Sequence, residues 1–124
     1  MTQRIYQIDA FTSKLFGGNP AAVCILDAWL DDELMQKIAA ENNLAETAFA
    51  VFKDNYYELR WFTPEIEVDL CGHATLATAF VLYNYYDYNK NTLRFFSPRS
   101  GELLVKKDET GLITMDFPTD DLIK

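Results

Sequence analysis

The sequence has few of the residues that build disulfide-stapled or metal-rich proteins. Its 124 residues include two cysteines, Cys24 and Cys71, and one histidine, His73. Two cysteines do not make a disulfide framework, and their number fits a reducing cytoplasm. One histidine excludes any mechanism that needs two imidazoles within one subunit. Because Cys71 and His73 supply only two metal ligands by spacing, we expect no metal site.

Positive charge is also scarce. Eleven lysines and arginines stand against nineteen aspartates and glutamates, so the net charge is -8. An acidic surface repels the phosphate backbone and anionic lipid, which counts against nucleic-acid and membrane-surface binding. The N-terminus lacks the pattern of a signal peptide, and no apolar run reaches the roughly 18 residues that span a bilayer. We expect a cytoplasmic protein whose partner is a small molecule or another protein.

Glycine is infrequent, with five residues in the chain. The one glycine-rich stretch, Gly17-Gly18-Asn19-Pro20, lacks the glycine count and the lysine of a phosphate-binding P-loop. It also leads into an expected strand instead of a helix. This stretch is therefore interpreted as a turn.

What the chain does have is a globular composition, with 49% hydrophobic residues. The length fits one domain or part of one. Alternating and apolar runs between turn residues predict a set of strands. The expected strands are Ile5–Phe11, Asn19–Leu26, Thr47–Phe52, Tyr56–Phe62, Thr92–Phe96, Glu102–Lys106 and Leu112–Phe117.

Two helices are expected, and they differ in their environment. An amphipathic helix from Asp32 to Glu41, preceded by Asp31 as a candidate cap, belongs on a surface. The stretch from Cys71 to Tyr83 has no polar stripe, so a helix there is wrapped by other elements. Together these elements predict an α+β fold in which a curved mixed sheet wraps around a buried central helix.

The start of that buried helix is a candidate site. Unpaired backbone N–H groups at Cys71, Gly72 and His73 attract an anion such as a ligand carboxylate, and Gly72 permits close approach. The pKa of a thiol at this position is expected to be lowered, which makes thiolate chemistry plausible. The alternative is structural: a buried Cys71, a packed Gly72, a hydrogen-bonded His73, and Asp69 as the helix cap.

Glu46 is a second candidate, because it stands between an asparagine-rich loop and an apolar strand. Desolvation at the mouth of a core is expected to raise the pKa of its carboxyl toward the range of a general acid/base. The alternative is a solvated loop glutamate. Glu65 and Glu67, in the loop after Pro64, are expected to be solvated.

Five stretches in order resemble the PhzF (phenazine-biosynthesis-like) isomerase family. Two further stretches, Phe96–Gly101 and Met115–Pro118, extend the resemblance to nearly the whole chain. The five stretches are Ile8-Asp9-Ala10-Phe11, Phe16–Val23, Asn43–Phe49, Phe62-Thr63-Pro64 and Asp69–Thr75.

The resemblance implies a diaminopimelate-epimerase-like fold of two similar lobes with a cofactor-free active site between them. By that likeness Glu46 is the general acid/base that moves a proton between carbons of a small carboxylate-bearing metabolite. Gly72 and His73 hold the substrate carboxylate, and Asn19 lines the same site. Family members of known activity isomerise a dihydro-hydroxyanthranilate, but the substrate cannot be carried over to this chain.

Two alternatives remain open at this point. Related cofactor-independent racemases and epimerases carry a cysteine at the matching helix start, so Cys71 is an alternative thiol base. PhzF-like proteins are also roughly twice as long, so residues 1–124 are interpreted as a truncated N-terminal lobe without its second lobe. Such a lobe is expected to be inactive alone. The competing hypothesis is a non-catalytic domain. Such a domain could form a homodimer that covers the apolar face left by the missing lobe.

Overall fold

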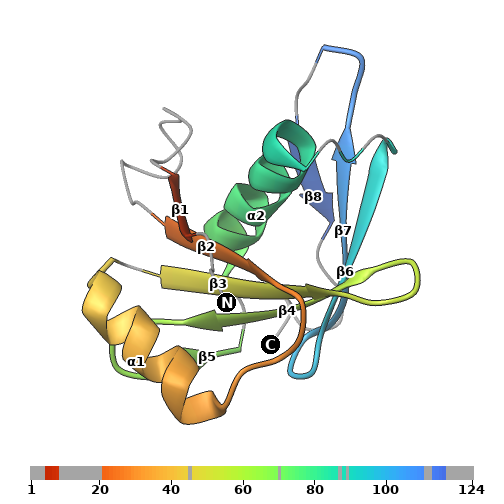
Figure 1. The fold of residues 1–124 in the computed structure, drawn as a ribbon. Coiled ribbons are helices and arrows are strands. Elements are labelled where there is room, and N and C mark those ends of the chain that lie inside the picture. Colours follow the sequence, from red (N-terminus) through yellow and green to blue (C-terminus); the bar gives the residue numbers. More distant parts are fainter. Residues whose placement is uncertain are drawn as a thin grey trace, which may run out of the picture.

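A computed structural model describes residues 5–8, 21–44, 46–69, 71–86, 88, 90–110 and 113–116. Within these residues the chain forms one curved, mixed sheet and two helices (Figure 1). The strands are β1 (Ile5–Ile8), β2 (Ala21–Leu26), β3 (Glu46–Phe52), β4 (Tyr57–Phe62), β5 (Glu67–Val68), β6 (Thr92–Ser97), β7 (Gly101–Lys107) and β8 (Ile113–Asp116). The helices are α1 (Asp32–Asn42) and α2 (Gly72–Tyr85).

The sheet follows the order β1-β2-β3-β4-β6-β7-β8, with the short β5 beside β4. β2 pairs with β3, and β4 with β6, in parallel, and the chain crosses over through α1 and α2 respectively. The remaining pairs are antiparallel, including the β3–β4 hairpin and the β6–β8 meander. At the β6–β7 turn Gly101 has a φ of 85°, a conformation that glycine adopts without strain. The expected α+β architecture with a curved mixed sheet is confirmed.

Helix α2 lies in the hollow of the curved sheet, as its uniformly apolar sequence predicts (Figure 1). Small residues dominate its buried positions, including Ala74, Ala77 and Ala79. These alanines let the helix axis approach the strands closely. Strand positions such as Leu59 and Phe95 fill the space around it. The result is one core cluster enclosed by the sheet.

Helix α1 packs on the other side of the sheet and makes a second core cluster. Its buried Met35 and Ala39 meet Phe49 and Phe62, whose rings stack edge to face at 5.4 Å. Asp31 occupies the expected cap position, but its side chain makes no capping hydrogen bond. The helix ends at Asn42 instead of Glu41.

Strand β3 is buried on both faces because it lies between the two cores. Its small residues Ala48 and Ala50 face α2, whereas Phe49 and Val51 face the α1 cluster. This explains why its sequence is a continuous apolar run without alternation. The strand begins at Glu46, so the candidate carboxylate stands where both cores end.

Two expectations about acidic residues are wrong. Glu67 belongs to β5, a strand too short to be predicted from periodicity, and its carboxylate is not solvated. It accepts two hydrogen bonds of 2.8 Å from Arg60, and its side chain is 15% exposed. Asp69 does not cap α2. The cap position belongs to Cys71, and Asp69 instead accepts a 2.8 Å hydrogen bond from Arg99.

Some expected features fall on residues outside the described part of the chain. These are the Gly17-Gly18-Asn19-Pro20 turn, the C-terminal end of the first expected strand, the N-terminal end of the second, and both ends of the last. No helix among the described residues is both long enough and apolar enough to cross a membrane.

Candidate active site

Glu46 is positioned by the return of the chain from α1 into β3. Asn43 takes a left-handed conformation with a φ of 53°, and its backbone N–H donates to the carbonyl of Ala39. The side-chain amide of Asn42 then donates to the hydroxyl of Thr47 at 3.3 Å. The asparagines of this loop therefore turn the chain and attach the end of α1 to the new strand. This places Glu46 at the N-terminal end of β3, beside α2.

Cys71 and His73 are positioned by the first turn of α2. Cys71 is the extended residue that precedes the helix, and its carbonyl accepts both the N–H of Thr75 at 3.1 Å and the Thr75 hydroxyl at 2.8 Å. The buried indole N–H of Trp61 donates to the same hydroxyl at 3.0 Å. This chain of hydrogen bonds fixes the start of α2 against strand β4.

The loop that leads to Cys71 is also attached to the β6–β7 turn. The Arg99 guanidinium binds the carboxylate of Asp69 and the carbonyl of Glu67, and the Ser100 hydroxyl donates to the carbonyl of Asp69. The sequence offered no signal for these contacts, because they join residues that only the folded sheet brings together. They connect a surface turn to the helix start.

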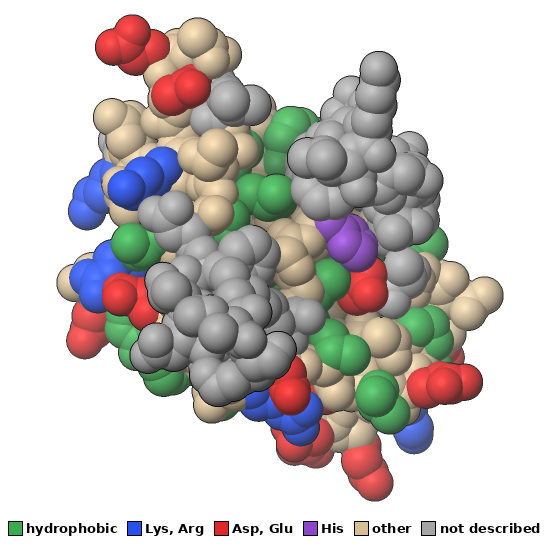
Figure 2. Space-filling view, turned by 180° about the vertical axis from the view of Figure 1, so that it is seen from behind, with side chains coloured by type: hydrophobic (Ala, Val, Ile, Leu, Met, Phe, Trp, Pro, Cys, Tyr) green, Lys and Arg blue, Asp and Glu red, His purple; other side chains and the backbone are tan. Residues whose placement is uncertain are grey.

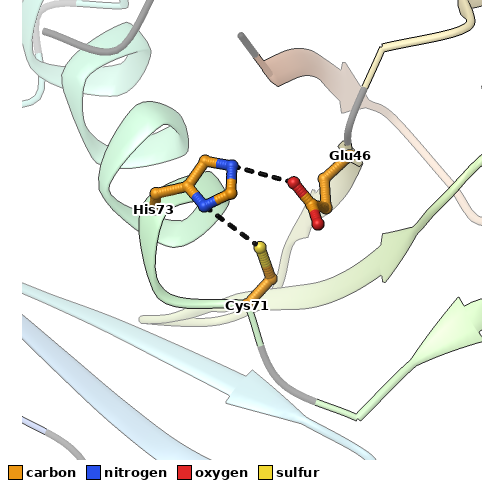
Figure 3. Close-up of side chains that lie close together, drawn as sticks. All are labelled: Glu46, Cys71 and His73. Atoms are coloured by element: carbon orange, nitrogen blue, oxygen red, sulfur yellow. Dashed lines mark hydrogen bonds and ion pairs between the residues drawn. The ribbon is translucent and has the colours of Figure 1, made fainter. Parts of the chain in front are cut away.

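The side chains of Glu46, Cys71 and His73 meet at this helix start (Figure 3). The imidazole lies between the other two groups: Nε2 is 2.8 Å from Oε1 of Glu46, and Nδ1 is 3.7 Å from Sγ of Cys71. The contact with Glu46 is an ion pair when the imidazole is protonated. Each ring nitrogen thus has a different partner.

The three groups lie at the boundary between core and solvent. The side chains of Glu46 and His73 are 20% and 17% exposed, while the two contacting atoms are shielded from solvent. Figure 2 shows the histidine at the surface, with an acidic and apolar side chains around it. A small molecule can therefore reach the site, but the groups that would touch it are partly desolvated.

The thiol of Cys71 does not behave as the sequence predicts. Its pKa is raised to about 12, mainly by burial and to a smaller extent by the neighbouring carboxylate of Glu46. The nearby backbone N–H groups of Ala74 and His73 act in the opposite direction but do not outweigh burial. The expected lowering by the helix start is therefore wrong, because desolvation of the thiolate costs more than the helix start returns.

The structure brings together four of the five candidate site residues. Glu46, Cys71, Gly72 and His73 lie at one place, whereas Asn19 lies outside the described residues. The count of two metal ligands also needs correction. Spacing along the chain supplies Cys71 and His73, but the fold adds Glu46, so three donor atoms lie within 4.8 Å of one another.

Chemically, the site combines two groups that can exchange protons, a carboxylate and an imidazole, and the two are in contact. Beside them, the first turn of α2 presents backbone N–H groups, and Gly72 carries no side chain that blocks approach. Such a helix start suits a ligand carboxylate. The arrangement is suited to an acidic small molecule that lies next to a carboxylate and an imidazole.

Comparison with known proteins agrees with this description. A family described as phenazine biosynthesis-like protein (PhzC-PhzF) matches residues 8–124. An uncharacterized isomerase of Pseudomonas aeruginosa is 61% identical over 118 residues, which are 95% of this chain and 45% of that protein. The human phenazine biosynthesis-like domain-containing protein is 49% identical over 123 residues, or 92% of this chain and 42% of its own length.

Solved structures show the same similarity. The crystal structure of a PhzF family protein from Enterococcus faecalis aligns with a TM-score of 0.81 and 59% identity, over 88% of this chain and 42% of that one. A predicted epimerase from P. aeruginosa aligns with a TM-score of 0.71 and 26% identity, over 93% of this chain and 43% of that one. The chain thus spans less than half the length of the relatives it matches.

Proposed function

Because the chain belongs to the phenazine biosynthesis-like protein family, we propose that it is the N-terminal lobe of a cofactor-independent isomerase. Its reaction moves a proton from one carbon to another on a small substrate that carries a carboxylate. The observation that carries the proposal is the 2.8 Å contact between Glu46 and His73 at the start of α2. Several relatives are named as isomerases, which supports the reaction class.

In this proposal Glu46 is the general acid/base. It takes a proton from one carbon, holds it while the substrate electrons rearrange, and returns it to a second carbon. The partly exposed carboxylate can reach a bound substrate, and its position at the end of strand β3 gives it a rigid support. No further co-reactant is needed, because Glu46 returns one proton to the substrate for each proton that it takes.

His73, Gly72 and Asn19 are the proposed binding residues. His73 and the N–H groups at Gly72 would hold the substrate carboxylate close to Glu46.

A thiol base at Cys71 is the second candidate, and it would make the protein a racemase or epimerase. The structural likeness to a predicted epimerase favours it, as does the position of the sulfur next to both Glu46 and His73. The raised pKa of the thiol disfavours it, because little thiolate forms near neutral pH. Glu46 therefore remains the preferred base.

The test needs a second lobe, since a site with one wall cannot exclude water from the reaction. A chimera joins this chain to the remaining part of the 61% identical P. aeruginosa isomerase. The chimera is incubated in D2O with candidate substrates, beginning with a dihydro-hydroxyanthranilate, and isomerisation and deuterium uptake are followed by mass spectrometry. The isolated chain serves as the inactive control.

We expect Glu46→Gln to lower turnover by several orders of magnitude, roughly the 10²–10⁴-fold contribution of general acid/base catalysis or more. Cys71→Ser should keep most of the activity. The reverse pattern, with activity lost in Cys71→Ser and kept in Glu46→Gln, would establish the thiol as the base. Turnover that survives in Glu46→Gln contradicts the assignment of that residue.

A further inference from the structure

Glu46, Cys71 and His73 also form a cluster of metal-ligand type. One sulfur, one imidazole nitrogen and one carboxylate oxygen lie within 4.8 Å of one another. Among the described residues, no lysine or arginine forms an ion pair with Glu46. Within this part of the chain, the side-chain cation that contacts the Glu46 carboxylate is the imidazole, when it is protonated.

The distance between the sulfur and the nearer ring nitrogen suits a zinc ion. With a Zn–S bond of about 2.3 Å and a Zn–N bond of about 2.0–2.1 Å, tetrahedral angles put the two ligand atoms about 3.6 Å apart. Sγ of Cys71 and Nδ1 of His73 are 3.7 Å apart. This separation matches the one that a zinc ion bound to both atoms requires.

The carboxylate of Glu46 is the third donor. One of its oxygens contacts Nε2 on the other side of the ring, while the carboxylate group as a whole also neighbours the thiol (Figure 3). To bind the ion, an oxygen of this carboxylate would have to move from Nε2 toward it, which requires a turn of the Glu46 side chain. Three protein ligands then leave one tetrahedral position for water or a ligand, as in catalytic zinc sites.

The charges favour a divalent cation of this kind. A carboxylate and a thiol that loses its proton on metal binding would together match the charge of Zn²⁺. Sulfur and imidazole donors favour zinc over magnesium or calcium, which prefer oxygen ligands. Because the side chains of His73 and Glu46 are 17% and 20% exposed, the ion has a path from solvent.

We propose that Glu46, Cys71 and His73 form a zinc-binding site with one open coordination position. The binding does not depend on the proposed isomerase activity. Its consequence does: a bound zinc ion stabilises the ionised carboxylate of Glu46 and makes it a weaker base, so zinc would inhibit the isomerase. Zinc binding and proton transfer then oppose each other at the same carboxylate.

The site is tested on the chain itself, without an affinity tag that adds histidines. Cobalt(II), a spectroscopic substitute for zinc, is titrated while absorbance is recorded, and zinc binding is measured by calorimetry. We expect one ion per chain, a sulfur-to-cobalt charge-transfer band, and visible bands of tetrahedral cobalt that zinc removes.

Matched variants identify the ligands. Glu46→Gln, Cys71→Ser and His73→Gln should each weaken zinc binding by at least about tenfold, the lower limit for disturbing even the partners of metal ligands. Cys71→Ser should also abolish the charge-transfer band. Cys24→Ala is the control, because Cys24 is a buried thiol of β2 in the other core cluster. Circular dichroism verifies that each variant is folded.

Two results overturn the proposal: no charge-transfer band at millimolar cobalt, or zinc binding that the Cys71 and His73 variants leave unchanged. The outcome is separable from the proposed function. Missing cobalt spectra beside a chimera whose activity depends on Glu46 refute the metal site alone, whereas spectra that depend on the three ligands beside an inactive chimera refute the isomerase alone.

Discussion

Oε1 of Glu46 and Nε2 of His73 lie 2.8 Å apart, although one residue begins a strand and the other lies in the first turn of a helix. Neither element would define this site alone. The sheet sets the position of the carboxylate, and the hydrogen bonds from Trp61 to Thr75 and from Thr75 to Cys71 set that of the imidazole. The chemistry of the site thus depends on the packing of β3 and β4 against α2.

Loss of the imidazole should impair binding of the substrate more than the proton transfer. In the chimera, His73→Leu removes the proposed hydrogen-bond donor to the substrate carboxylate, and a hydrogen bond to a charged group is worth about 1.5–3 kcal/mol. We expect KM to rise about ten- to hundredfold with a smaller change in kcat, measured by steady-state kinetics. A fall in kcat at constant KM would instead place His73 in the proton transfer.

The buried hydroxyl of Thr75 should contribute measurably to stability. Thr75→Val keeps the shape of the side chain but leaves the indole N–H of Trp61 without its acceptor. A buried unsatisfied donor costs about 1–3 kcal/mol of the free energy of unfolding, which urea denaturation can measure. Thr75→Ser keeps the hydroxyl and should retain most of that energy. Equal stability of the valine and serine variants would show that the hydrogen bond contributes nothing.

Alkaline solution should destabilise the chain. Burial raises the pKa of Cys24 and of Cys71 from 9.0 to about 12. Between these values the unfolded thiols lose protons that the folded thiols keep, so the unfolded state binds fewer protons and stability falls as pH rises. The free energy of unfolding should decline from about pH 9 upward. A Cys24→Ala, Cys71→Ala double variant should show a shallower decline, and an unchanged slope would contradict the prediction.

The same two thiols should react slowly with alkylating reagents in the native chain. Both side chains are buried, and the thiolate is the nucleophile. Mass spectrometry after iodoacetamide treatment near neutral pH should show little modification until denaturant is added. Rapid native labelling at Cys71 would revive the thiol-base alternative.

The bidentate pair between Arg60 and Glu67 should stabilise the loop before the site. Their side chains are only 17% and 15% exposed. Loss of the carboxylate would therefore leave the partly buried guanidinium without its main partner. Glu67→Gln should lower the free energy of unfolding by about 1–3 kcal/mol in urea denaturation. Asp32→Asn removes the exposed partner of the same arginine and should have little effect. A larger loss in Asp32→Asn than in Glu67→Gln would reverse this assignment.

Much of the architecture could be predicted from hydrophobic patterns. The apolar stretch that begins at Cys71 indicates a wrapped helix, and the alternation at Leu93 and Phe95 matches the buried face of β6. β5 could not be predicted, because two residues carry no periodicity. The ion pair of Glu67 with Arg60 also requires knowledge of which strands are neighbours.

The site shows the same division. Position in the sequence indicates Glu46 and His73 as candidates. It does not reveal that they are in contact, or that Glu46 joins Cys71 and His73 as a third possible metal ligand. The predicted lowering of the Cys71 pKa was wrong, because a sequence indicates where a helix begins but not how deeply a sulfur atom is buried. Local patterns and the family resemblance therefore indicated candidate residues, whereas their contacts and burial depend on tertiary packing.

The burial of β3 on both faces limits the positions that the carboxylate of Glu46 can take. If the strand slipped by one residue, Phe49 and Val51 would turn toward α2, where Ala48 and Ala50 leave room only for methyl groups. The volumes of these side chains thus oppose a shift of β3 and fix the position of Glu46 before any ligand binds. Mutations at the alanines of this strand, with no contact to the ligand, would then be the ones that retune the reaction.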